Sequence, residues 1–118
     1  MAERVVPCIH LFTGADRRSH VERKQLPLGA ALQAKIAHFE ETAAGSAFDW
    51  HTAPCEQLVI TLSGTLEFTT RDGETFMLRP GDILLASDTR GTGHRWRLID
   101  DQPWRRLYVE LAAASSSS

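Results

Sequence analysis

The sequence has few of the residues that mark several common protein classes. It contains two cysteines in 118 residues, Cys8 and Cys55, which are too few and too far apart for a disulfide framework or a paired-cysteine zinc or redox motif. The formal net charge is only −2, which argues against nucleic acid or an anionic membrane surface as the main partner. No apolar run approaches a membrane span in length. The stretch from Val5 to Phe12 is interrupted by Pro7 and His10, so it does not resemble a secretory signal.

The composition is that of an ordinary soluble domain. Hydrophobic residues make up 42% and charged residues 24% of the chain. A chain of 118 residues can build one hydrophobic core but not two. We therefore expect one domain over residues 1–111, a disordered Ala/Ser tail over 112–118, and a cytoplasmic protein with reduced thiols.

Short alternating runs dominate the second half of the chain. From Gln57 to Leu62, one face carries leucine and isoleucine and the other carries Gln57, Val59 and Thr61. The Asp72-Gly73 pair is typical of a tight hairpin. Many short strands separated by turn residues predict an antiparallel β-sandwich or barrel.

The segment from Ala30 to Ala44 is ambiguous. Its Ala, Leu, Gln, Lys and Glu content favours a helix on propensity alone. Leu32, Ile36 and Phe39 would then lie near one helical face.

Two glycine- and histidine-bearing stretches resemble the two motifs of the cupin family. The first cupin motif places Gly, His, a second His, Glu and Gly in order. Gly45, His51 and Gly64 occupy matching positions, whereas Ala53 replaces the second histidine and Gln57 replaces the glutamate.

The second cupin motif ends in a proline-and-glycine loop followed by His and Asn. Gly81, Gly91 and His94 match it, with Thr89 in place of the proline, Leu98 in place of the asparagine, and a loop two residues longer. The two motifs together span Gly45 to Leu98. The chain therefore resembles a small single-domain microbial cupin.

This resemblance implies an all-β fold, the antiparallel cupin jelly-roll β-barrel. It also implies that Lys35 to Thr42 is a strand, because cupins carry a barrel strand just before the first motif and tertiary context can override propensity. Cupins commonly pair through outer strands. We therefore expect a homodimer formed through the apolar face of Leu58, Ile60 and Leu62.

The resemblance places His51, Gln57 and His94 together inside the barrel as candidate metal ligands. Imidazole nitrogen binds borderline divalent metals well, and an amide oxygen can serve as a weaker neutral ligand. Without the family's glutamate the set is uncharged, which favours one Zn, Ni or Fe ion over Mn²⁺. The alternative is that both histidines are hydrogen-bonded residues of a metal-free barrel.

Four further residues are expected to line the pocket: His38, Cys55, Val59 and Trp96. In an extended chain Cys55 would share the face of His51 and Gln57, so its thiolate could join the site unless Pro54 breaks the alternation. Two functions stay open for a pocket that takes a small-molecule ligand. One is a metal-dependent enzyme, dioxygenase- or isomerase-like, acting on a small organic substrate. The other is a metal-free protein that binds or isomerises a small ligand.

Overall fold

The computed structural model describes residues 5–29 and 31–112, and within these ranges it contains β-strands and no helix. No segment of the described chain therefore forms a helix that could cross a membrane. The ten strands are β1 Val5–Thr13, β2 Ser19–Pro27, β3 Ala34–Thr42, β4 Ala47–His51, β5 Gln57–Ser63, β6 Leu66–Thr70, β7 Thr75–Leu78, β8 Ile83–Ser87, β9 His94–Leu98 and β10 Trp104–Leu111.

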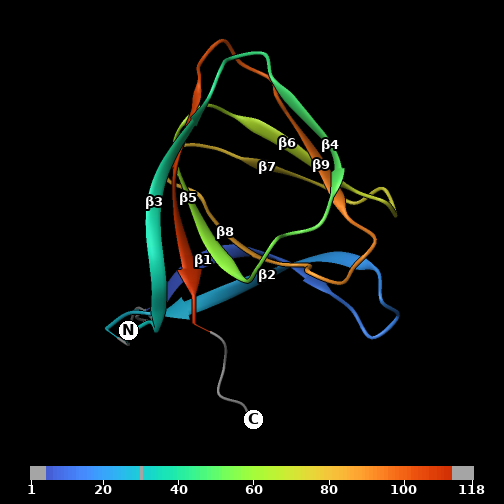
Figure 1. Ribbon diagram of the computed structural model, residues 1–118, viewed down its shortest axis with the longest axis vertical. Helices are drawn as coiled ribbons and strands as arrows, with labels where there is room; N and C mark the ends of the chain where they lie inside the picture. The colour runs from blue at the N-terminus through green and yellow to red at the C-terminus, as the bar shows by residue number, and fades with distance from the viewer. Residues whose placement is uncertain (1–4, 30, 113–118) are drawn as a thin grey trace.

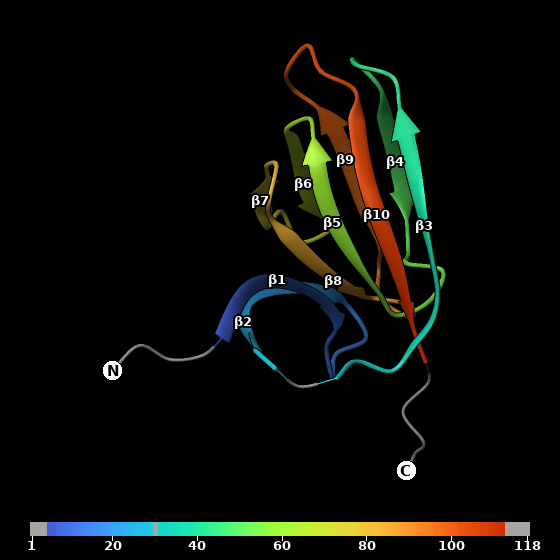
Figure 2. The same cartoon turned by 90° about the vertical axis from the view of Figure 1, so that its left-hand side faces the viewer.

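The strands form two sheets that face each other (Figure 1). The larger sheet has the order β2-β1-β8-β5-β10-β3 and the smaller one β4-β9-β6-β7. Figure 2 shows β3, β10 and β5 in front of the smaller sheet, with β1 and β2 curled beneath. All pairs are antiparallel except β1 with β8, which run parallel. This is the expected all-β jelly-roll, with one parallel pair in it.

The facing sides of the two sheets enclose the main core. Leu11 of β1, Leu66 of β6 and Leu78 of β7 have no exposed surface, and Phe68 of β6 stacks on Phe76 of β7 with ring centroids 4.8 Å apart. Burying each such side chain contributes about 1.5–3 kcal/mol to folding. The core fills part of the space between the sheets and leaves the rest as a cavity.

The central strands β5 and β10 turn their polar faces inward. Gln57 of β5 and Arg106 of β10 line the space between the sheets. On the outer side, Leu58 of β5 packs with Cys8 and Leu85 into a second cluster. These inward faces are mixed, because Val59 and Trp104 also lie on them and belong to the main core, and they border a cavity that can hold water or a ligand.

The segment with helical composition is a strand, as expected. β3 runs over Ala34–Thr42 and pairs along its length with β10, so backbone hydrogen bonds to a neighbour replace those of a helix. Residues 1–4 of the expected domain, Ala30, and residues 113–118 of the expected tail lie outside the described residues.

Candidate active site

A cavity of about 730 Å³ lies between the two sheets. This volume is in the range of pockets that hold small organic ligands. The structure brings to its wall all seven residues singled out from the sequence: His38, His51, Cys55, Gln57, Val59, His94 and Trp96.

His51 and His94 meet because of strand register. In the β4–β9 pair, His51 lies directly opposite His94, and their ring centroids are 4.3 Å apart. A register shift between Phe48 and His51 places Phe48 against the His51 ring, with centroids 4.3 Å apart. Gly93, with φ of 96°, lets the strands approach, since a Cβ there would lie 3.0 Å from the His51 carbonyl oxygen.

A buried carboxylate orients His94. The ring Nδ1–H donates to Asp88 Oδ2 at 2.7 Å, and neither side chain is more than 5% exposed. Asp88 also accepts hydrogen bonds from the Ser19 hydroxyl at 2.9 Å and the Ala53 amide at 3.2 Å. The three donors hold the carboxylate in place. Because the Nδ1 proton of His94 is used here, its Nε2 carries a lone pair.

A backbone carbonyl orients His51. Its Nδ1 lies 2.7 Å from the carbonyl oxygen of Asp49, which can only accept, so Nδ1 carries the proton and Nε2 the lone pair. Burial lowers the pKa of the His51 imidazole below its usual value, and the neighbouring His94 adds to this effect, while the hydrogen bond to Asp49 opposes it. At neutral pH the His51 ring is therefore neutral.

Gln57 and Cys55 contact each other in the cavity wall. The Cys55 thiol lies 3.8 Å from Gln57 Oε1 and donates to it. Burial raises the pKa of the Cys55 thiol, and Glu110 raises it further. The Cys55 thiol therefore loses its proton less readily than that of an exposed cysteine. Its hydrogen bond engages the amide oxygen that was expected to act as a ligand.

The two histidines are suited to a shared ion, whereas Gln57, the expected third ligand, is a weaker one. Imidazoles that bind one ion at about 2.0–2.1 Å from each nitrogen have centroids about 4.5 to 5.2 Å apart, and the observed 4.3 Å lies just below this range. Both rings also have the oxygen partner at Nδ1 that metal-binding histidines usually have. Within residues 5–29 and 31–112, however, no three His, Cys, Asp or Glu side chains are grouped to hold an ion. A third ligand would have to be the neutral Gln57.

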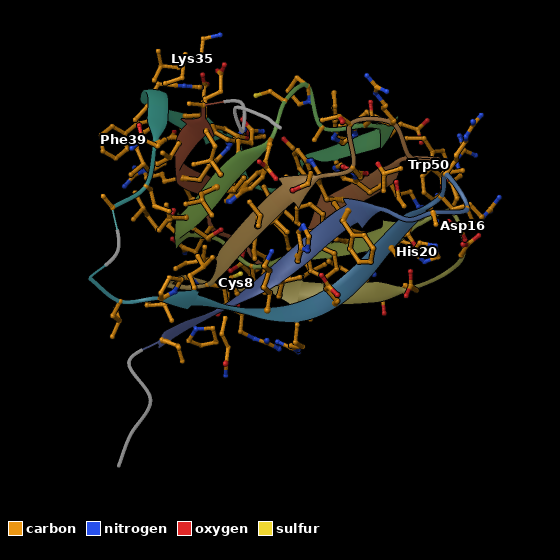
Figure 3. All side chains as sticks on the ribbon, turned by 90° about the horizontal axis from the view of Figure 1, so that it is seen from below. Cys8, Asp16, His20, Lys35, Phe39 and Trp50 are labelled. Atoms are coloured by element: carbon orange, nitrogen blue, oxygen red, sulfur yellow. The ribbon has the colours of Figure 1, made fainter. Side chains whose placement is uncertain are left out.

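Of the remaining three histidines, one lines the cavity and two lie outside it. His38 lines the cavity with its ring stacked on Tyr108 at 5.2 Å. His10 binds Glu22 on the outer face of the larger sheet. His20 binds Asp16 near the turn between β1 and β2, which Figure 3 places far from β3. The hydrogen bond to Asp16 raises the pKa of His20.

The sequence analysis did not identify two charged residues of the site, Asp88 and Arg106. Asp88 lies six residues before His94 in the loop after β8, where nothing in the pattern marks it as buried. Arg106 lies between Trp104 and Tyr108 on one face of β10, two residues from each. The two alternating faces of β10 can be recognised in the sequence, but packing decides which of them turns inward.

Comparisons with known proteins agree with this architecture. A family model described as a cupin domain matches residues 38–110, which is more than half of the chain. A cupin-domain-containing oxidoreductase from Neurospora crassa, srdB, is 39% identical over 70 residues, which are 58% of this chain and 34% of that protein. The match therefore spans about a third of the length of this curated relative.

Solved structures give the same fold. A DUF861 family protein from Thermotoga maritima superposes with a TM-score of 0.52 and 28% identity, over 64% of this chain and 77% of that one. A cupin domain from Bordetella pertussis superposes with a TM-score of 0.53 and 15% identity, over 96% and 98% of the two chains. With both motif histidines in one cavity between the sheets of a jelly-roll, and the family model matching most of the barrel, this chain belongs to the cupin domain family.

Proposed function

We propose that this cupin domain holds one divalent transition metal ion, Zn²⁺, Ni²⁺ or Fe²⁺, and acts on a small organic substrate in its cavity. His51 and His94 would supply imidazole nitrogens and Gln57 an amide oxygen. When bound, the ion would supply Lewis-acid or oxygen-binding chemistry. The observation that carries the proposal is the pair of adjacent imidazoles whose Nδ1 protons are both bound by oxygen, so that both Nε2 atoms are free to act as ligands.

The rest of the cavity supports a small-molecule substrate. Its volume of about 730 Å³ suits a compact organic molecule. Phe68, Trp96 and Trp104 form an apolar wall that would exclude water from the bound molecule. The fungal relative is named an oxidoreductase, which agrees with a metal-dependent reaction of the dioxygenase type.

One observation favours a second candidate, a metal-free protein that binds or isomerises a small ligand. Asp88 holds His94 in the tautomer whose Nε2 can accept a proton, which is the arrangement of a general base. The described residues offer no charged third ligand beside the two histidines. In this reading Asp88 orients the base and stabilises the imidazolium that forms.

The substitution Gln57→Glu distinguishes the two candidates. With a metal at His51 and His94, the new carboxylate adds a charged ligand, so the protein should retain more metal and melt higher when Zn²⁺, Ni²⁺ or Fe²⁺ is added. Without a metal, the same carboxylate lies opposite Glu110 of β10, and Arg106 is four residues away along that strand, so no cation is beside it and the protein should melt lower. The measurements are metal content of untagged protein and thermal melting with and without each ion.

Three alanine variants complete the experiment. His51→Ala and His94→Ala should each lose most of the bound metal, because a single imidazole beside an amide oxygen is a weak site. His20→Ala is the matched control, since His20 lies outside the cavity and should not change metal content. Equal metal content in all three variants, or a Gln57→Glu protein that melts lower and gains nothing from any ion, would rule out the metal.

A further inference from the structure

Arg106 is a buried cation in the wall of the cavity. Its side chain comes from the inward face of β10, and the residue is 8% exposed. Among the described residues, no carboxylate lies within ion-pair distance of its guanidinium. A buried charge without an opposite charge is costly, so a structure that retains one usually has a use for it.

The hydrogen bonds of Arg106 leave one end of the guanidinium free. Nη1 donates to Thr42 Oγ1 at 2.7 Å and to the Trp104 carbonyl at 3.0 Å, and Nε donates to the Tyr108 hydroxyl at 3.1 Å. The Trp104 ring lies under the guanidinium, 3.9 Å from its carbon. These contacts use three of the five N–H donors. In the described part of the chain, no acceptor is recorded for the two donors on Nη2.

Tyr108 supplies a further free donor beside the guanidinium of Arg106. Because its hydroxyl oxygen accepts the proton of Arg106 Nε, its own O–H proton remains available. Its ring is held by stacking on His38. Two adjacent donors, one of them charged, match the two oxygens of a carboxylate.

We propose that Arg106 and Tyr108 bind the carboxylate of the substrate, so that the small organic substrate of this cupin is a carboxylic acid. This rests on the proposed function only in taking the cavity as the substrate site. The guanidinium of Arg106 would pair with one carboxylate oxygen through Nη2, and the Tyr108 hydroxyl would donate to the other. A series of contacts along the cavity wall links Arg106 to Trp104, Trp104 to Phe68 at 6.3 Å between ring centroids, and Phe68 to the His94 ring at 5.9 Å. The carboxylate would thus be held two aromatic side chains away from the histidines along this wall, and the rest of the molecule would extend toward them and react there.

The other charges of the cavity favour a single carboxylate over a phosphate. Glu110 also lines the cavity, but its carboxylate lies 3.9 Å from Lys35 Nζ. Arg106 is the one lysine or arginine side chain in the described cavity wall, and no carboxylate of the described residues lies within ion-pair distance of it. Phosphate would place nearly two negative charges beside this one cation, whereas succinate would place a single carboxylate there and its second carboxylate at the far end of the molecule.

The test is anion binding by untagged protein kept in EDTA, so that its outcome does not depend on any metal. The probes are succinate, its neutral analogue succinamide, and inorganic phosphate, at constant ionic strength. The readout is the NMR signal of Arg106 Nε–H, together with the affinity from titration. Succinate should bind saturably and shift this signal, succinamide should not, and phosphate should bind more weakly than succinate.

Variants separate ligand binding from a purely structural role. Arg106→Gln should weaken succinate binding by about tenfold or more, and Tyr108→Phe, which keeps the stacked ring, should weaken it less. Arg105→Gln is the matched control, since Arg105 is the adjacent residue of the same type and binds Glu41 on the outer face. It should leave succinate affinity unchanged. Thermal melting of each variant shows whether it is folded, and Arg106→Lys provides a folded cation without the planar fork if Arg106→Gln is unstable.

Several outcomes would overturn the proposal. They are equal affinity for succinate and succinamide, stronger binding of phosphate than of succinate, or equal losses in the Arg105→Gln and Arg106→Gln proteins. The Arg106→Gln substitution should leave metal content unchanged, because Arg106 is not among the proposed ligands. Loss of metal binding with intact succinate binding would therefore refute the proposed metal site alone. Metal binding without succinate binding would refute the carboxylate site alone.

Discussion

The substitution Asp88→Asn is the most direct test of how the site is held together. Asp88 is fully buried and its carboxylate accepts three hydrogen bonds, from His94 at 2.7 Å, Ser19 at 2.9 Å and Ala53 at 3.2 Å. Asparagine has nearly the same shape but only one acceptor oxygen, and its NH₂ group must face one of these donors. The change thus removes the charge and disrupts the network without creating a cavity.

The expected cost follows from those contacts. A hydrogen bond to a charged group contributes about 1.5–3 kcal/mol, and leaving a buried donor unpaired costs about 1–3 kcal/mol. Since asparagine can keep one or two of the three bonds, we expect the free energy of unfolding to fall by about 2–4 kcal/mol. If the amide NH₂ faces His94, the ring must move its proton from Nδ1 to Nε2, and the lone pair is lost from the cavity side. Metal affinity should then fall about 10- to 100-fold.

Urea denaturation measures the change in the free energy of unfolding. The ¹⁵N chemical shifts of the His94 ring show which of its two nitrogens carries the proton. Asp100→Asn is the control, because Asp100 accepts a single exposed bond from the Gln102 amide. That change should alter stability by no more than about 0.5 kcal/mol. An Asp88→Asn protein with the stability and the His94 tautomer of the unsubstituted protein would refute the proposed role of Asp88.

Three further predictions concern the fold. Burial lowers the pKa of His51 in the folded protein. Between the ordinary histidine value of about 6.5 and this lowered pKa, the unfolded chain binds more protons than the folded one, so the free energy of unfolding should fall as the pH drops through this interval. Equilibrium unfolding against pH should show this slope, and His51→Gln should reduce it; an unchanged slope contradicts the argument. Gly91→Ala should cost about 1–3 kcal/mol, since its Cβ would lie 2.2 Å from Ser19 Oγ, and in a Ser19→Ala background the cost should be smaller. We also propose the homodimer through the outer face of the larger sheet. Of the face expected to form it, Leu58 is buried against Cys8 and Leu85 and Ile60 packs on that cluster, whereas Leu62 is 52% exposed, and Phe39 on the neighbouring strand β3 is 72% exposed (Figure 3 shows Phe39). Sedimentation should give a dimer and Phe39→Asp a folded monomer, whereas a monomer mass for the unsubstituted protein refutes it.

The sequence predicted the fold well because strand alternation and turn chemistry are local signals. The run from Gln57 to Leu62 and the Asp72-Gly73 turn appear in the structure as β5 and the β6–β7 connection. The segment over Ala34–Thr42 shows the limit of local signals. Its composition favours a helix, and only the resemblance to cupins indicated the strand that pairing with β10 stabilises.

For the site, the sequence identified the two histidines through their motifs, and the structure places them opposite each other in the β4–β9 pair. The orientation of the two imidazole rings could not be derived from the motifs. Asp88 reaches His94 because a loop folds back over six residues and Ser19 from β2 completes the network. Such contacts join segments that are distant along the chain, so no spacing rule predicts them.

The tertiary structure also decided which face of each central strand turns inward. The sequence shows two faces on β10, with Arg106 and Tyr108 on one and Leu107 and Val109 on the other, and the usual rule would bury the leucine and valine face. The barrel instead encloses a cavity whose wall combines Trp104, Arg106 and Tyr108. The guanidinium of Arg106 turns inward and lies over the Trp104 ring, while Val109 packs in the outer cluster. Alternation along one strand is a property of the chain, but the direction of each face depends on what the two closed sheets leave between them.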